Sequence, residues 1–175
     1  MIDLLAGWLG DLGFSCEIQQ VTPGKFNLLA SFGSGPGGLV LAGHSDTVPY
    51  DPQLWKTDPL KLSEDGDRWI GLGVCDMKGF FPLIIEAVRP LLDQPFRQPL
   101  LILATCDEES SMSGARALAD AGRPLGRAAV IGEPTGLKPI RLHKGVMMER
   151  IDILGRSGHS SDPVSYTHLT LPTTP

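Results

Sequence analysis

Apolar residues in the first third of the chain follow a helical repeat and then two strand-like runs. Residues 2–12 carry apolar side chains at helical spacing, and Gly13 follows, which predicts a helix that ends there. The segments KFNLLASF (25–32) and GLVLAGH (38–44) predict two strands joined by a turn in the cluster GSGPGG. That cluster lacks the Gly-Lys-Ser/Thr ending of a phosphate-binding loop, so we interpret it as a turn.

The middle of the chain changes from turn-forming residues to a long apolar segment. Residues 45–70 are rich in Asp, Pro and Trp, and the segment MKGFFPLIIEAVRPLL that comes after Asp76 predicts a helix beginning near Lys78. Asp76 is a candidate cap for this helix. Pro82 then falls in the first helical turn, where a missing N–H costs nothing.

The remaining apolar runs predict a layered α/β fold. Residues 99–106 and 128–132 are continuous apolar runs, which indicate strands buried on both faces, and residues 111–122 predict a helix between them. Alternating strands and helices indicate an α/β sandwich. After Pro139 the pattern changes, and the alternation in MMERIDI predicts a strand of a different sheet, so we place a domain boundary near residue 144.

Composition and charge narrow the classes of function. The chain is 42% hydrophobic, and its formal net charge of -5, with no run of Lys or Arg, predicts no nucleic-acid partner and no membrane partner. The N-terminus lacks a signal-peptide pattern, so we expect a cytoplasmic protein. Cys16, Cys75 and Cys106 are odd in number and widely spaced, which argues against a disulfide framework or a thiolate zinc site.

Polar residues suited to metal binding stand near the ends of the apolar runs. His44 and Asp46 follow LVLAG, Glu108 and Glu109 follow LILATC, Glu133 follows AAVIG, and Asp76 lies in the loop GLGVCDMKG. In open α/β sheets, ligands bind at the carboxyl ends of strands, so we expect these residues to converge on one crevice. An imidazole with several carboxylates suits zinc, cobalt or manganese better than calcium, which takes only oxygen ligands.

Each of these residues also has a simpler interpretation when it is taken singly. Asp76 caps a helix, Glu108 and Glu109 are first-turn acids of the next helix, and His44 is a loop histidine. The spacing of His44 and Asp46 also allows the aspartate to orient the imidazole without touching metal.

Taken together, six segments carry a more specific signal. GHSDTVP, GLGVCDMKG, ATCDEESSMSGA, IGEPT, HKG and GHSSDP occur in this order. Over residues 1–164 the chain resembles the co-catalytic zinc amidohydrolases, a family that includes acetylornithine deacetylase, succinyl-diaminopimelate desuccinylase, aminoacylase and related carboxypeptidases. The resemblance implies a three-layer α/β/α zinc-peptidase-like sandwich, present as its amino-terminal half, with the start of a smaller α+β lid or dimerisation domain.

The resemblance also implies where the domains begin and end. Residues 1–143 would be a partial catalytic zinc-binding domain, and residues 144–164 the start of the lid. Residues 165–175 would be a tail foreign to the family, because the ending VSYTHLTLPTTP is rich in Thr and Pro and lacks helical periodicity.

By the same resemblance, the intact subunit would hold two zinc or cobalt ions. His44, Asp76 and Glu133 would hold one ion, and Asp76 would bridge to a second ion held by Glu109. The family supplies a further histidine for the second ion from its carboxyl-terminal half. We therefore expect the second site to be incomplete in this chain, and the chain alone to have little or no activity.

The catalytic roles follow the same correspondence. Asp46 would orient His44, and Glu108 would be the general base that takes a proton from the attacking water and passes it to the departing amine. His159 in GHSSDP matches a histidine that stabilises the oxyanion from the partner subunit, which implies a homodimer. Without the motif, His159 would be a surface loop histidine.

The expected substrate is a small acylated amino acid. The segment GEPTGLKPIRLHKG followed by GHSSDP most resembles the family members that hydrolyse N2-acetyl-L-ornithine, a step of arginine biosynthesis, and this resemblance implies the same substrate. His143 either lines the substrate pocket or packs at the domain hinge, and Lys144 is a candidate partner for a substrate carboxylate. The alternatives are a desuccinylase or another acyl-amino-acid amidohydrolase, a non-catalytic relative, and a truncated fragment without a function of its own.

Overall fold

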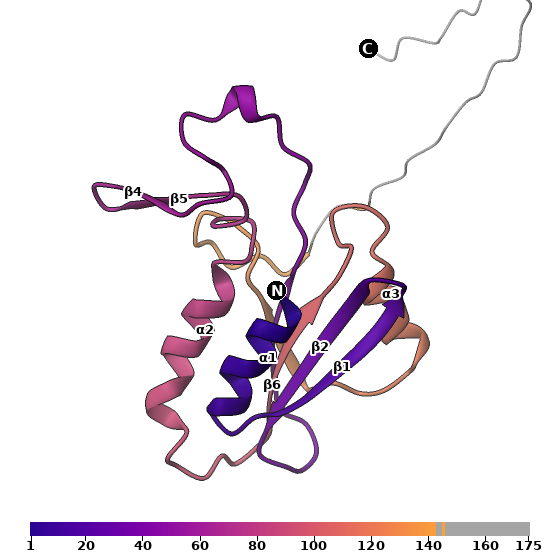
Figure 1. The fold of residues 1–175 in the computed structure, drawn as a ribbon. Helices are drawn as coiled ribbons and strands as arrows, with labels where there is room; N and C mark the ends of the chain where they lie inside the picture. Colours follow the sequence, from indigo (N-terminus) through magenta and orange to yellow (C-terminus); the bar gives the residue numbers. More distant parts are fainter. Residues whose placement is uncertain (143–144, 146–175) are drawn as a thin grey trace, which may run out of the picture. The chain divides into compact units, whose positions relative to one another are not determined.

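A mixed sheet of five strands organises the part of the chain that the structure, a computed structural model, describes: residues 1–142 and 145 (Figure 1). The strands lie in the order β1-β2-β6-β3-β7. Their bounds are Ser15–Thr22 for β1, Lys25–Phe32 for β2, Leu100–Thr105 for β6, Leu39–His44 for β3 and Ala128–Ile131 for β7. The pairs β1–β2 and β2–β6 are antiparallel, whereas β6, β3 and β7 run parallel.

Helices lie on both faces of this sheet and make three layers. Figure 1 shows α1 (Ile2–Asp11) and α2 (Phe80–Val88) side by side on one face. The short helix α3 (Ser113–Asp120) contributes Leu118 to the apolar cluster of the other face. The expected α/β/α sandwich is therefore confirmed for the described residues.

Short elements complete the described chain. The hairpin β4 (Ser63–Asp65) and β5 (Arg68–Ile70) forms a separate two-stranded sheet, and the single turns η1 (Pro52–Leu54) and η2 (Arg89–Leu91) lie in connections. Among residues 1–142 and 145, no helix is both long enough and apolar enough to cross a membrane.

The larger core lies between the sheet and the pair α1 and α2. Its buried members include Leu5 and Leu9 of α1, Phe81 of α2 and Ile102 of β6, each at most 1% exposed. Burying a side chain of this size stabilises the fold by roughly 1.5–3 kcal/mol. Helix α1 ends as its sequence predicts, because Gly13 takes a left-handed conformation with φ of 88° just after the last turn.

The strand predictions were correct in position and incomplete in arrangement. The runs 25–32 and 38–44 are strands, but β6 lies between them in the sheet, so the turn that joins them does not make a hairpin. The neighbour of β2 on its other side is β1, which the apolar pattern did not indicate. The prediction that residues 128–132 form a strand buried on both faces was wrong, since all four residues of β7 are exposed at the sheet edge.

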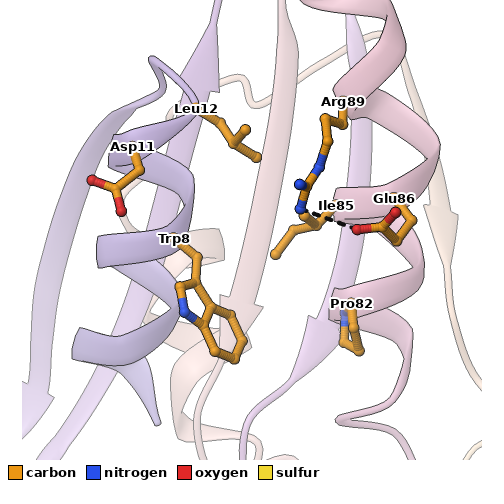
Figure 2. Close-up of a pocket in the computed structure, with 7 residues that line it drawn as sticks. All are labelled: Trp8, Asp11, Leu12, Pro82, Ile85, Glu86 and Arg89. Carbon is orange, nitrogen blue, oxygen red and sulfur yellow. Dashed lines mark ion pairs between the residues drawn. The ribbon is translucent and has the colours of Figure 1, made fainter.

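A groove lies between α1 and α2 on the face of the sheet that these two helices cover. Figure 2 shows Trp8 of α1 and Leu12, which directly follows α1, across the groove from Pro82 and Ile85 of α2. An ion pair joins Arg89 and Glu86 at the rim. The volume of the groove is about 380 Å³. None of the residues predicted to bind metal or substrate lines this groove.

Residues Met1–Lys138 form one compact unit. The strand expected from MMERIDI lies outside the described residues. The predicted ranges 1–143, 144–164 and 165–175 stay predictions.

Candidate metal centre

Three parallel strands end at the same edge of the sheet and bring the candidate ligands together. His44 is the last residue of β3 and is paired with Thr105, the last residue of β6. Glu133 lies two residues beyond the end of β7. The sequence argument that residues from separate strands meet at their carboxyl ends therefore describes the observed arrangement.

The His44 ring is buried and held from one side by its own loop. It is 1% exposed, and its Nδ1 lies 3.1 Å from the main-chain oxygen of Asp46. A carbonyl oxygen can only accept, so Nδ1 carries the proton in this contact. Nε2 then points toward Asp76 Oδ1 at 3.0 Å and Glu133 Oε1 at 3.9 Å. In metal-binding histidines, a hydrogen bond from the ring nitrogen that does not face the metal fixes the orientation of the ring, as the Nδ1 contact does here.

Charge around the ring changes its protonation. Burial alone lowers the pKa of His44, but the hydrogen bond to Asp76 and the charges of Asp46, Glu133 and Glu108 outweigh burial, so that the net pKa is raised. Burial raises the pKa of Glu133 and of Glu109, and the nearby charge of Asp76 raises both further. Clustered carboxylates of this kind repel one another unless a cation lies between them.

One donor atom from each of His44, Asp76 and Glu133 lies within 4.8 Å of the other two. The side chains of Asp76 and Glu133 are 51% and 40% exposed, so the cluster opens to solvent on one side. An imidazole nitrogen with two carboxylate oxygens at this spacing fits a divalent transition metal.

Asp76 reaches the cluster from a tightly closed loop rather than from a helix end. The amide of Gly79 donates to the oxygen of Gly73 at 3.2 Å, and a Cβ on Gly79 would lie 2.2 Å from the oxygen of Val74. The residue at the N-terminus of α2 is Gly79, and the helix has no side-chain cap. The interpretation of Asp76 as a helix cap was therefore wrong.

Glu133 is positioned by close packing between β7 and α2. A Cβ on Gly132 would lie 2.2 Å from Cγ of Phe80, so only glycine lets the chain pass the ring at this point. The amide of Gly132 donates to the oxygen of Ala42 at 3.1 Å, which continues the ladder with β3. Glu133 thus leaves the sheet at a fixed place.

Asp46 connects the strand end of His44 to the loop of the two glutamates. Its carboxylate oxygens accept hydrogen bonds from the amides of Glu108 and Glu109 at 3.2 and 3.1 Å. Its Oδ1 lies 3.6 Å from His44 Nδ1, beyond hydrogen-bond distance. Glu108 and Glu109 precede α3, which begins at Ser113, so they are loop residues and the interpretation as first-turn acids was wrong.

Not every predicted site residue can be placed. His143, Lys144 and His159 lie outside the described residues, and their roles stay predictions. The structure adds three residues that the sequence reasoning missed, Lys25, Asn27 and Asp107, which bond to the loop of the glutamates or to each other. Asp107 directly precedes Glu108, but nothing in the sequence indicates that Lys25 lies beside it.

Comparison with known proteins identifies the family. Residues 40–169 match the peptidase family M20/M25/M40. The chain is 55% identical over 165 residues to the acetylornithine deacetylase of Klebsiella pneumoniae strain 342, covering 93% of this chain and 43% of that protein. The chain thus spans less than half the length of this relative.

Solved structures agree on the fold. Human carnosine dipeptidase 1 is 26% identical, with a TM-score of 0.62 over 75% of this chain and 32% of that chain. The M20 family metallo-carboxypeptidase Sso-CP2 from Sulfolobus solfataricus is 21% identical, with a TM-score of 0.64 over 75% of this chain and 31% of that chain. The donor cluster of the described residues suits a divalent metal, and the chain belongs to the peptidase family M20/M25/M40.

Proposed function

We propose that this chain is part of a metal-dependent amidohydrolase that cleaves N2-acetyl-L-ornithine to L-ornithine and acetate. The observation that carries the proposal is the convergence of His44, Asp76 and Glu133 from three separate segments. The 55% identity to an acetylornithine deacetylase supports the choice of substrate. The proposal includes a cytoplasmic homodimer that serves arginine biosynthesis, with neither nucleic acid nor membrane as a partner.

The metal ligands follow from the donor cluster. His44, Asp76 and Glu133 would hold one zinc or cobalt ion, and Asp76 with Glu109 would contribute to a second. Burial and the nearby charge of Asp76 raise the pKa of Glu109, and a cation between the two carboxylates would relieve their repulsion. When bound, such ions polarise a carbonyl oxygen and make water a stronger acid.

The proton transfers are assigned to Glu108. The main-chain amide of Glu108 donates a hydrogen bond to the carboxylate of Asp46, which holds the Glu108 backbone beside the His44 segment. The charge of Glu108 also contributes to the raised pKa of His44. We assign to Glu108 the role of accepting the proton of the attacking water and passing it to the amine as the amide bond breaks. One carboxylate serves both transfers, and no net proton stays on the protein.

The remaining roles concern residues outside the described part of the chain. His159 is proposed to stabilise the oxyanion in the partner subunit's site. His143 and Lys144 are proposed to contact the substrate, Lys144 through a carboxylate. Such a division of the site between two copies makes the dimer necessary for turnover.

The test requires a protein of the relatives' length. We would place residues 1–164 in a chimaera, in exchange for the aligned segment of the Klebsiella pneumoniae relative, and measure zinc-dependent acetate release from N-acetylornithine. Glu108→Ala should lower kcat by about 10²–10⁴-fold, because a general base contributes that much. Binding of Co²⁺ should be retained in this variant, since Glu108 is not an assigned ligand.

Three outcomes separate the alternatives. Turnover lost in Glu108→Ala supports both the deacetylase and the assigned base. Release of succinate from an N-succinylated diamino acid without release of acetate would move the activity to the sister enzyme. If the chimaera binds Co²⁺ but turns over no acyl amino acid, the amidohydrolase proposal is refuted.

A further inference from the structure

The loop that carries Glu108 and Glu109 has an unfavourable backbone. Asp107 and Met112, at its two ends, have φ of 64° and 56°, in the left-handed region. The loop is closed by hydrogen bonds from the amide of Met112 to the oxygen of Asp107 at 2.7 Å and from Gly114 to Cys106 at 3.2 Å. Such conformations persist in non-glycine residues only where surrounding contacts hold them. Contacts of Asp107 and Asn27 hold this loop.

Asp107 is the centre of one group of contacts. Its carboxylate accepts hydrogen bonds from the hydroxyls of Ser110, Ser111 and Ser113 at 2.9, 2.7 and 2.9 Å. It also forms an ion pair with Lys25 of β2. These four contacts make the Asp107 carboxylate the point around which the loop folds.

Sheet register explains why Lys25 is the partner. In the antiparallel pair β2–β6, Leu28 is opposite Ala104. Lys25 and Asp107 each lie three residues beyond this last pair, on the same end of the two strands, where their side chains form the ion pair. Asn27 lies two residues along β2 and so on the same face as Lys25.

Asn27 fixes the two ends of the same loop. It is 0% exposed, accepts a hydrogen bond from the amide of Cys106 at 3.0 Å, and donates to the oxygen of Gly114 at 3.0 Å. On the opposite side, the carboxylate of Asp46 accepts from the amides of Glu108 and Glu109. The loop is thus held between β2 and the segment that follows β3.

We propose that Lys25 and Asp107 are positioning residues, which set where the Glu108 and Glu109 side chains stand relative to the cluster of His44, Asp76 and Glu133. The roles of the two glutamates rest on the proposed function. Strand β2 contributes no candidate metal ligand, so we assign to it only the role of holding the glutamate loop in place. The pair differs from a simple surface ion pair because Asp107 is 13% exposed and bonds to the loop at three further points.

The chain offers a matched control. Arg123 and Glu17 form another ion pair between distant segments at 2.9 Å, and Arg123 is 51% exposed, close to the 47% of Lys25. Lys25→Met removes the positioning contact, Lys25→Arg restores a cation at the same place, and Arg123→Met removes the control pair. None of these changes alters a metal ligand or the base.

The first measurement is amide hydrogen exchange on the 175-residue chain without metal. We expect Lys25→Met to speed exchange in residues 107–112 on the order of 10-fold relative to wild type, because opening of the loop becomes easier. Lys25→Arg and Arg123→Met should exchange within about twofold of wild type in this segment. Equal exchange in Lys25→Met and Arg123→Met would overturn the proposal, as would faster exchange spread equally over β6 and α1.

The second measurement separates this proposal from the proposed function. In the chimaera, Lys25→Met should lower kcat on the order of 10-fold with KM within about twofold, because a displaced base slows chemistry more than binding. Lys25→Arg should restore the rate. Equal loss in Arg123→Met, or no loss in Lys25→Met, would contradict positioning. If the wild-type chimaera turns over no substrate, the proposed function fails, and the exchange experiment still decides the role of Lys25.

Discussion

Asn27→Ala tests whether β2 holds the glutamate loop, through a side chain buried from all solvent. Asn27 makes two hydrogen bonds to main-chain atoms at the ends of the loop and a third, from Nδ2 to Oε1 of Gln19, at 3.1 Å. Removing the side chain leaves the amide of Cys106 buried without this acceptor. In the wild-type chain, the hydrogen bond to Asn27 Oδ1 at 3.0 Å satisfies this main-chain amide.

The expected magnitude follows from the two main-chain contacts. An unpaired buried amide costs about 1–3 kcal/mol, and loss of the bond to Gly114 adds about 1 kcal/mol. We expect Asn27→Ala to lower the free energy of unfolding by about 3 kcal/mol. Gln19→Ala removes only the third bond, at a partly buried position that water can reach, and should cost less than about 1 kcal/mol.

Urea unfolding followed by far-ultraviolet circular dichroism measures both variants. With a slope of about 2 kcal/mol/M, a loss of about 3 kcal/mol lowers the urea midpoint by about 1.5 M. Gln19→Ala should shift the midpoint by less than about 0.5 M. A shift in Asn27→Ala no larger than that in Gln19→Ala would refute the reasoning, because it would mean that the two main-chain contacts add nothing to the partly buried contact with Gln19.

Three further perturbations test the site and its surroundings. Gly132→Ala places a Cβ 2.2 Å from the ring of Phe80 and should cost about 1–3 kcal/mol of stability, measured by urea unfolding; an unchanged midpoint would contradict the packing argument. Zinc at 100 times its Kd should raise the free energy of unfolding by about 2.7 kcal/mol. His44→Ala should abolish this gain, whereas His168→Ala, a control in residues 165–175, should keep it. Because Ile131 is 62% exposed on β7, Ile131→Ser should lower binding of a hydrophobic dye with little change in stability; unchanged fluorescence would place the dye elsewhere.

The sequence predicted where the strands of the candidate site end better than it predicted the contacts that hold these strand ends in place. Residues 39–44, 100–105 and 128–131 are apolar enough to be recognised as strands, and parallel strands in a layered fold direct their carboxyl ends to one edge. His44 and Glu133 therefore could be placed near each other from local pattern and one topological rule. Neither step requires knowledge of side-chain packing.

The contacts that hold the site depend on strand order, which local pattern does not encode. Strand β6 enters the sheet between β2 and β3, although more than fifty residues separate it from either in sequence. Only this order puts Lys25 beside Asp107. Strand β1 was missed for a related reason: most of its residues are exposed, and it is fixed by pairing with β2 rather than by an apolar face.

The exposure of β7 shows a second limit of predicting structure from the apolar pattern of the sequence. An apolar run of four or five residues predicts burial, but it does not specify which segment covers it. In the described residues Val130 and Ile131 are 50% and 62% exposed, and a groove lined by apolar residues of β3, β6 and β7 runs along this edge. The apolar composition of a strand indicates that the strand prefers apolar surroundings. It does not indicate which segment of the fold packs against the strand.

Asp46 contacts both the imidazole of His44 and the loop of the two glutamates. His44 Nδ1 makes its short contact with the main-chain oxygen of residue 46, which any amino acid supplies. What only an acidic side chain of this length supplies is a pair of charged acceptors for the amides of Glu108 and Glu109. One residue thereby fixes the imidazole through its backbone and the glutamates through its carboxylate. The His-Ser-Asp spacing places a candidate ligand at the end of β3 and the anchor of the glutamate loop two residues beyond it, so the end of β3 positions both parts of the candidate site.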